Sequence, residues 1–264
     1  MSTGTTQERI EAVAKELLHA EETRTDRHPV TDEWPGLDLA TAYRIQDRLL
    51  AGKVARGDQL VGVKLGLTSR AKQQRMGIDS PLTAWLTAGM VLDSGVPIPT
   101  DQLIHPRVEP EIVFILGERL SGPGVTAESA MDAVRSVYAG LEVIDSRFVD
   151  FRFTLPNVVA DNASSARFVL GGVERDPRDL DLALEACVLQ VDDAVVDTAT
   201  GAAVQGHPAQ ALAVAANTLA ERGLALEAGW TILTGGMTDA VTVHTGQRVV
   251  AEFAHLGKVS VAVA

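Results

Sequence analysis

The sequence predicts an α+β fold, with a helical N-terminal lobe over residues 1–58 and a β-rich body over residues 59–264. Two observations predict this class. Apolar residues recur at helical spacing in the first part of the chain, and from Leu60 onward short alternating strands with glycine punctuation take over. Neither an internal repeat nor a convincing linker divides the chain, so we expect a single domain over residues 1–264.

The N-terminal lobe is predicted to contain two helices. Thr5 and Glu8 have the spacing of a capping box, and Gly57 is suited to end the second helix. The stretch HPVTDEWPG between the helices is typical of a polar loop. The apolar residues at helical spacing are Ile10, Val13 and Leu17 in the first helix, and Ala42, Ile45 and Leu49 in the second.

The body alternates strands with two predicted helices. The helices are TAESAMDAVRSVYAG, with Thr126 as its cap, and HPAQALAVAANTLAERG; SRAKQQRMG reads as a short helix or turn. The segment CVLQVDDAVVDTATG predicts a hairpin that turns at Asp192 and Asp193. The remaining strands are predicted in LVGVKLGLT, RVEPEIVFILG, GLEVIDSR, TILTGG, VTVHTGQRVVAEF and KVSVAVA.

Composition excludes several classes of function. The formal net charge of −12 argues against a nucleic-acid or anionic membrane partner. We expect no membrane span, because no apolar run reaches about 18 residues, and no signal peptide. Cys187 is the only cysteine, which excludes an intrachain disulfide and favours the cytoplasm. An acidic substrate would be repelled by this protein unless a bound divalent cation reversed the charge locally.

Three glutamates lie in segments that otherwise read as buried strands. Glu109 and Glu111 in RVEPEIVFIL point to the same side of their strand, and Glu142 stands between apolar residues in GLEVIDSR. Carboxylates without cysteine or histidine partners favour a hard cation, Mg²⁺ or Mn²⁺. The alternative is that these glutamates form structural salt bridges with Arg107, Arg147 or Lys64.

Two basic side chains are further candidates for this site. His105 would stand about 13 Å from Glu109 along an extended strand, so we interpret it as a loop histidine and not as a ligand. Lys64 has glycines beside it, at positions 62 and 66, which would let an anionic ligand approach its ammonium group. The alternative is a solvated lysine on an edge strand.

Two polar segments could line a pocket. VVADNASSARFVLGG contains Asp161, Asn162, Ser164 and Ser165 between apolar runs, and its simplest interpretation is a tight turn. In TGGMTDA, glycines allow close backbone approach and Thr238 offers a hydroxyl group. The sequence has no G-x-G-x-x-G, no P-loop and no G-x-S-x-G motif.

Taken in order, KLGLTS, HPRVEPEIVFILG, GLEVIDSR, VVADNASSARFVLGG and LTGGMTDAV resemble the hydratase and decarboxylase branch of the fumarylacetoacetase superfamily. The resemblance runs from about Arg44 to the C-terminus. It implies a mixed β-roll or barrel-like body, with Mg²⁺ or Mn²⁺ bound by Glu109, Glu111 and Glu142. Lys64 and Asp79 match active-site positions, and Ser164 and Thr238 match substrate-lining segments.

The segments DSPLTAWLT, FRFTLPNVVADNASS and LTGGMTDAV resemble the decarboxylases of this branch more than the hydratases. The resemblance implies decarboxylation of 2-oxo-3-hexenedioate (4-oxalocrotonate) to 2-hydroxypenta-2,4-dienoate and CO₂ in meta-cleavage degradation of aromatic compounds. It also implies a homo-oligomer and a complex with the pathway's hydratase. The alternatives are a 2-oxopent-4-enoate hydratase and a non-catalytic small-acid binding protein or partner subunit. Arg147, Arg152 and Arg167 could contact an anion, but we expect them on the surface.

Overall fold

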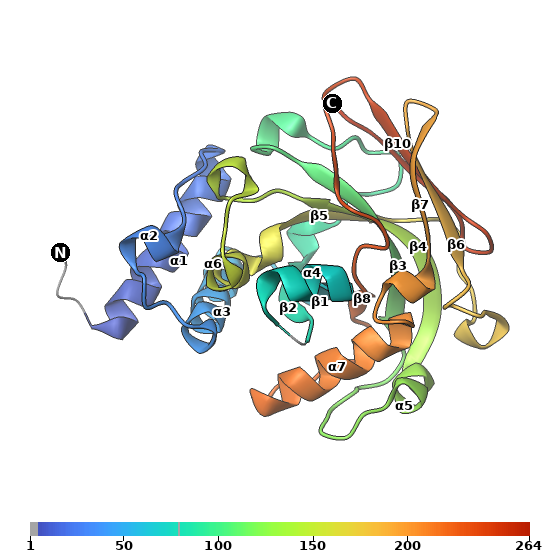
Figure 1. Ribbon diagram of the computed structural model, residues 1–264, viewed down its shortest axis with the longest axis horizontal. Coiled ribbons are helices and arrows are strands. Elements are labelled where there is room, and N and C mark those ends of the chain that lie inside the picture. Colours follow the sequence, from blue (N-terminus) through green and yellow to red (C-terminus); the bar gives the residue numbers. More distant parts are fainter. Residues whose placement is uncertain (1–4, 79) are drawn as a thin grey trace.

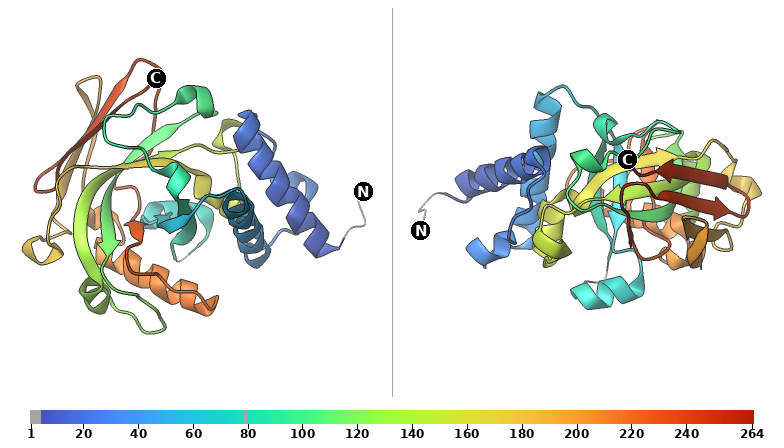
Figure 2. Two further views of the ribbon diagram at one scale, coloured as in Figure 1. Left: turned by 180° about the vertical axis from the view of Figure 1, so that it is seen from behind. Right: turned by 90° about the horizontal axis from the view of Figure 1, so that it is seen from above.

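The computed structural model describes residues 5–78 and 80–264 and confirms the predicted fold class (Figure 1). Helices near the N-terminus stand to one side of a strongly curled sheet, and the two views in Figure 2 show the same separation. The helices are α1 (Thr6–Thr23), α2 (Val30–Glu33), α3 (Leu39–Ala55), α4 (Arg70–Met76), α5 (Ala127–Asp132), α6 (Leu155–Ala160) and α7 (Pro208–Glu221).

The predicted capping box begins α1. The Thr5 hydroxyl accepts a hydrogen bond from the Glu8 backbone N–H at 3.3 Å, and the Glu8 carboxylate accepts one from the Thr5 N–H at 2.6 Å. The predicted apolar faces of α1 and α3 are buried and pack on each other. Their cluster also includes Leu82, Phe148 and Val158, so the helical lobe shares a core with the body. The polar loop predicted between the helices contains the single turn of α2.

Two sheets form the body. The larger has the order β2-β1-β8-β3-β4-β5, with β9 beside β3, and the smaller has the order β11-β10-β6-β7. Pairing is antiparallel except between β1 and β8. The strands are β1 (Leu60–Gly66), β2 (Leu82–Thr87), β3 (Arg107–Leu116), β4 (Val134–Ile144), β5 (Ser165–Leu170), β6 (Ala186–Val191), β7 (Ala194–Thr200), β8 (Thr231–Leu233), β9 (Val241–Thr242), β10 (Arg248–Phe253) and β11 (Gly257–Ala262).

One predicted helix is wrong over most of its length. In TAESAMDAVRSVYAG, α5 begins after the predicted cap Thr126 but ends at Asp132, and β4 begins at Val134. β4 pairs with β3 from end to end, so the ladder outweighs the helix propensity of this alanine-containing stretch. The predicted hairpin is confirmed, since Asp192 and Asp193 connect β6 to β7 with left-handed φ values of 50° and 65°. Within residues 5–78 and 80–264, no helix is long and apolar enough to cross a membrane.

Candidate active site

The structure brings the three predicted glutamates to one buried place in the large sheet. Glu109 and Glu111 lie on β3, and Glu142 lies on β4 directly opposite Glu109. Side chains of directly opposed residues, and of alternate residues in one strand, point to the same side of a sheet. The exposed fractions are 9% for Glu109, 0% for Glu111 and 1% for Glu142. Strand pairing therefore concentrates three carboxylates where water is largely excluded.

Lys64 compensates part of this charge. Its ammonium group donates a hydrogen bond to Oε2 of Glu142 at 3.0 Å, and both side chains are buried. The alternative of a solvated edge-strand lysine is wrong, because β1 lies between β2 and β8. The alternative that one of the glutamates forms a salt bridge with Lys64 is confirmed for Glu142. The other oxygen of Glu142 accepts a hydrogen bond from the Ser165 hydroxyl at 3.4 Å.

The glycines that follow β8 lie against the glutamates. The Gly235 N–H donates to Oε2 of Glu111 at 2.7 Å, and Gly235 has a φ of +115° that favours glycine. A Cβ atom on Gly236 would lie 1.5 Å from Oε2 of Glu109. The backbone at these glycines thus approaches two of the three carboxylates closely, those of Glu109 and Glu111, as we predicted.

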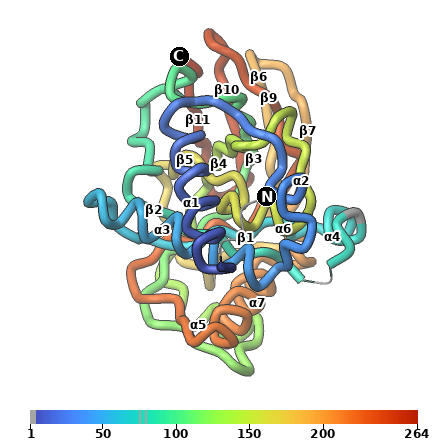
Figure 3. The backbone as a smooth tube through the Cα atoms, turned by 90° about the vertical axis from the view of Figure 1, so that its left-hand side faces the viewer, coloured from blue at the N-terminus to red at the C-terminus, as the bar shows by residue number. Residues whose placement is uncertain are grey.

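A second lysine, which the sequence pattern does not indicate, lies near Glu109. Lys72 lies on the short helix α4, which projects at the periphery of the molecule (Figure 3). Its Nζ lies 3.7 Å from Oε2 of Glu109 and 3.6 Å from Oδ1 of Asp239, and it donates to the Thr238 carbonyl oxygen at 3.3 Å. Helical spacing in SRAKQQRMG gave no indication of these contacts, because their partners lie far away in the sequence.

These groups line a pocket that combines charge with apolar surface. Lys64, Lys72, Glu109 and Glu142 supply the charged side chains of its lining. The apolar part of the lining includes Leu82, Phe151, Phe153 and Val158. A small organic acid with a short carbon chain suits such a mixture, since its charged groups and its hydrocarbon part each meet a matching surface.

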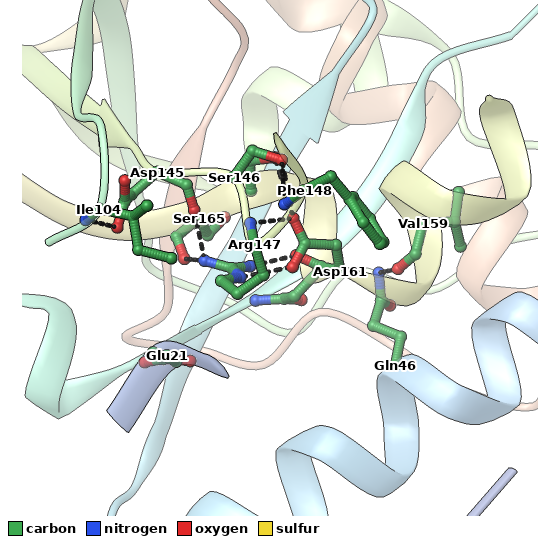
Figure 4. A network of polar contacts seen from close by, with 12 residues as sticks. Glu21, Gln46, Ile104, Asp145, Ser146, Arg147, Phe148, Val159, Asp161 and Ser165 are labelled. Atoms are coloured by element: carbon green, nitrogen blue, oxygen red, sulfur yellow. Dashed lines mark hydrogen bonds and ion pairs between the residues drawn. The ribbon is translucent and has the colours of Figure 1, made fainter. Parts of the chain in front are cut away.

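Arg147, for which surface placement was predicted, is buried instead (Figure 4). Its guanidinium group pairs with the Asp161 carboxylate. It also donates to the carbonyl oxygens of Asp145 at 2.7 Å and Ser165 at 3.2 Å. A buried arginine needs several acceptors to offset its desolvation, and here they come from the segments that flank the pocket wall. Burial raises the pKa of Asp161 to about 6, although Arg147 opposes that rise.

The polar segment that follows Asp161 is the predicted tight turn, and it also forms part of the pocket wall. Asn162, Ala163 and Ser164 have left-handed φ values of 50°, 50° and 58° in succession. The Ser164 hydroxyl donates to Asp161 at 3.2 Å, and the Asn162 side chain bonds both the N–H and the carbonyl of Trp85, at 2.8 and 2.9 Å. Ala163 and Ser164 line the pocket. Hydrogen bonds to neighbouring segments therefore hold an uncommon backbone conformation in the wall.

The cluster is short of positive charge. Burial raises the pKa of Glu111 well above its ordinary value, and the nearby charges of Glu142 and Glu109 raise it further. Burial also raises the pKa of Glu142, and Lys64 only partly opposes this effect. For Lys64 itself, burial alone would lower the pKa, but the negative charges of the three glutamates outweigh burial and raise it.

The glutamates fit a hard cation by chemistry. All their donors are carboxylate oxygens, and Oε1 of Glu111 is buried with no hydrogen-bond partner in the described part of the chain. As the side chains stand, no three His, Cys, Asp or Glu residues of ranges 5–78 and 80–264 are arranged to hold a metal ion. Lys64 and Lys72 contact Glu142 and Glu109 instead. The predicted metal role remains a prediction that requires these side chains to turn toward one another.

The remaining predicted residues have different outcomes. Asp79 lies outside the described residues. Thr238 meets Lys72 through its backbone oxygen, while its hydroxyl donates to the Asp239 carbonyl at 3.0 Å. His105 is the loop histidine that we expected: its Nε2 lies 2.7 Å from the Ser146 carbonyl oxygen. Lys72 and the two phenylalanines of the lining were not predicted; the aromatic residues in RFVDFRF are the signal in the sequence for the phenylalanines.

Fold and site together define a protein with a curled sheet that surrounds an acidic pocket containing two lysines. The model of the fumarylacetoacetate (FAA) hydrolase C-terminal family matches residues 60–264. The chain belongs to this family.

Within this family, the chain is similar to decarboxylases and hydratases over most of its length. The chain is 41% identical over 255 residues to a 4-oxalocrotonate decarboxylase of Pseudomonas sp. (strain CF600), covering 97% of each chain. It is 36% identical to a 2-hydroxyhexa-2,4-dienoate hydratase of Comamonas testosteroni, covering 90% of this chain and 91% of the relative. The solved structure of 4-oxalocrotonate decarboxylase from Pseudomonas putida G7, complexed with magnesium and adipate, superposes with a TM-score of 0.96 at 38% identity, covering 100% of both chains.

Proposed function

We propose that this protein is a divalent-metal-dependent decarboxylase that converts 2-oxo-3-hexenedioate to 2-hydroxypenta-2,4-dienoate and CO₂. The observation that carries the proposal is the buried cluster of Glu109, Glu111 and Glu142 beside Lys64, at a pocket that Glu109, Glu142 and Lys64 line together with apolar side chains. The similarity over the whole chain to decarboxylases with this activity in their names supports it, as does the magnesium named with the P. putida G7 structure.

In the proposed site, Glu109, Glu111 and Glu142 would hold Mg²⁺ or Mn²⁺. When bound, the cation would supply Lewis acidity to the 2-oxo acid end of the substrate. Lys64 would stabilise negative charge that develops on that end, or deliver a proton; its position in the pocket lining beside Glu142 supports this role. The phenylalanines of the lining would exclude water from the hydrocarbon part.

Three further residues complete the proposal. Asp79 would relay a proton. Ser164 would contact the substrate, which agrees with its place in the pocket lining. Thr238 would contribute less directly, because its carbonyl oxygen positions Lys72.

We further propose a cytoplasmic homo-oligomer of single-domain subunits that associates with a hydratase acting on the product. Cys187 supports the location, since a lone buried thiol suits a reducing compartment. The exposed edge strand β7, where Val195 and Val196 are solvent-accessible, offers a surface for such association. Size-exclusion chromatography with light scattering, with and without a purified hydratase, would measure both assemblies.

The test of the reaction is a spectrophotometric assay of 2-oxo-3-hexenedioate with Mg²⁺ or Mn²⁺, combined with CO₂ detection. The proposal expects the absorbance of 2-oxo-3-hexenedioate to be replaced by that of the dienol product as CO₂ is released. Consumption of 2-hydroxypenta-2,4-dienoate offered in a separate reaction, with no CO₂ released from 2-oxo-3-hexenedioate, would establish the hydratase alternative, which the 36% identity to a hydratase favours over other reactions. Binding without turnover would indicate the non-catalytic alternative. Full activity after exhaustive chelation would overturn the metal requirement.

A further inference from the structure

The pocket contains a second ammonium group, that of Lys72, which has no role in the proposed reaction as described above. Among the described residues of its lining, Lys64 and Lys72 are the cationic ones. Lys64 is committed to Glu142 at 3.0 Å, with only 5% of its side chain exposed. Lys72 is held less tightly: its ion pairs measure 3.6 and 3.7 Å, and its side chain is 27% exposed.

The partners of Lys72 are easy to exchange. Asp239 has 91% of its side chain exposed, and a pair with so exposed a carboxylate contributes little because water and salt screen it. Glu109, the other carboxylate, is one of the groups proposed to hold the cation. A divalent cation on Glu109 would repel the nearby ammonium group of Lys72 and release it for another anion.

We propose that Lys72 determines specificity for dicarboxylates, with its ammonium group receiving the second carboxylate of the substrate. The inference rests on the proposed function. The formal charges support it. The buried cluster and the pocket lining together hold three glutamates and two lysines, with the exposed Asp239 left out of the count, so a divalent cation gives these groups a formal charge of +1, which the 2-oxo acid end of the substrate then neutralises. Without Lys72, a second carboxylate would enter against a net negative charge and beside phenylalanines.

The proposal also assigns Lys72 an effect on binding more than on the chemical step. During decarboxylation the bond between the departing carboxylate and its neighbouring carbon breaks. The electron pair moves into the conjugated chain toward the 2-oxo group, neutral CO₂ leaves, and the resulting dienolate takes up one proton. Negative charge thus leaves the vicinity of Lys72 as the transition state forms. An ion pair stronger in the ground state lowers KM without raising kcat.

Calorimetry with unreactive ligands tests this assignment. In saturating Mn²⁺, 2-oxoadipate and 2-oxohexanoate present the same 2-oxo acid end, and only the former carries a second carboxylate. Lys72→Met is expected to weaken 2-oxoadipate binding by about 10- to 100-fold, the loss of a hydrogen-bonded ion pair, and to leave 2-oxohexanoate binding within about twofold. Lys72→Arg, which keeps the charge, should retain most of the preference.

Two further variants sharpen the test. Asp239→Asn removes a competing carboxylate and should strengthen 2-oxoadipate binding, the opposite direction from Lys72→Met. Lys15→Met makes the same charge change on an exposed face of α1 and should change neither affinity. Mn²⁺ titrations and circular dichroism of each variant establish that the metal is bound and the fold retained. With the natural substrate, Lys72→Met should raise KM and leave kcat undiminished.

The outcomes separate this inference from the proposed function. If the unmodified protein with Mn²⁺ binds neither ligand, the proposed function fails. If it binds both, and Lys72→Met leaves the preference for 2-oxoadipate unchanged or weakens both ligands equally, the role of Lys72 is overturned while the proposed function stands. Should Lys72→Met not fold, either of two results overturns it as well: no preference for 2-oxoadipate in the unmodified protein, or no gain in 2-oxoadipate affinity in Asp239→Asn.

Discussion

Replacing Lys64 by Met should destabilise the metal-free protein strongly. The ammonium group of Lys64 lies 3.0 Å from Glu142, and the exposed fractions of the two side chains are 5% and 2%. Removal of one partner leaves the other charge buried and uncompensated, which costs about 3–5 kcal/mol of unfolding free energy. Glu109 and Glu111 increase the repulsion that remains. For a protein of this size the loss corresponds to a fall in Tm of roughly 6–20 °C.

Thermal and urea unfolding, followed by circular dichroism after chelation, measure this loss. A matched control is Lys258→Met, because Lys258 pairs with Glu252 at 2.8 Å while both side chains are largely exposed. That exposed pair should contribute no more than about 1 kcal/mol. The double variant Lys64→Met with Glu142→Gln should recover part of the stability, since it removes both charges.

Metal addition provides a second measurement on the same variant. A ligand that binds only the folded state stabilises it by about 2.7 kcal/mol at 100 times its Kd. If Glu142 helps to hold the cation, Mn²⁺ should raise the Tm of Lys64→Met more than that of the unmodified protein, because the cation replaces a missing positive charge. A stability loss for Lys64→Met no larger than that of Lys258→Met would refute this account of the buried cluster.

Three other changes have defined outcomes. Gly236→Ala should weaken Mn²⁺ binding at least about tenfold by calorimetry, because its Cβ would lie 1.5 Å from Oε2 of Glu109; unchanged affinity would contradict metal binding by Glu109 from its position against Gly236. Glu111→Gln should stabilise the chelated protein by about 1 kcal/mol in urea, since it removes a buried, repelled charge, while Mn²⁺ no longer stabilises it. The pKa of Asp161, about 6, lies above its ordinary value of 3.8, so its contribution to stability is full below about pH 4 and is lost as pH rises through 6. The stability difference between Asp161→Asn and the unmodified protein should therefore shift by about 1–3 kcal/mol in favour of the variant between pH 4 and pH 7, and a constant difference would contradict the raised pKa.

The shared face of Glu109 and Glu111 could be predicted because it depends only on the alternation of side chains along one strand. Glu142 could be suspected for a similar local reason, since a lone carboxylate in an apolar strand needs compensation. Its position directly opposite Glu109 could not be predicted. That position depends on the register of β3 with β4, and the start of β4 was itself assigned to a helix.

Non-local pairing also explains the errors about the two lysines. Lys64 was left open as an edge-strand residue because β8, which makes β1 an interior strand, comes from residues 231–233. Nothing in the seven residues of α4 indicates that Lys72 reaches Glu109, which lies 37 residues further along the chain. Surface placement is predicted for Arg147 because arginine is rarely buried in proteins. Its burial depends on acceptors that lie 14 and 18 residues further along the chain, the Asp161 carboxylate and the Ser165 carbonyl oxygen.

The different burial of the two lysines explains how an acidic site can exist before any cation binds. A strand face with three carboxylates would oppose folding by its own repulsion, and Lys64 offsets part of this repulsion from its buried position beside Glu142. Lys72 offsets it only provisionally, through longer contacts to Glu109 and to an exposed aspartate. If a divalent cation binds Glu109, the positive charge of Lys72 is no longer compensated there. The second carboxylate of the substrate can then pair with it. Lys72 thus stabilises the folded protein before the cation binds, by compensating Glu109. After the cation binds, the same ammonium group is available to bind the second carboxylate of the substrate.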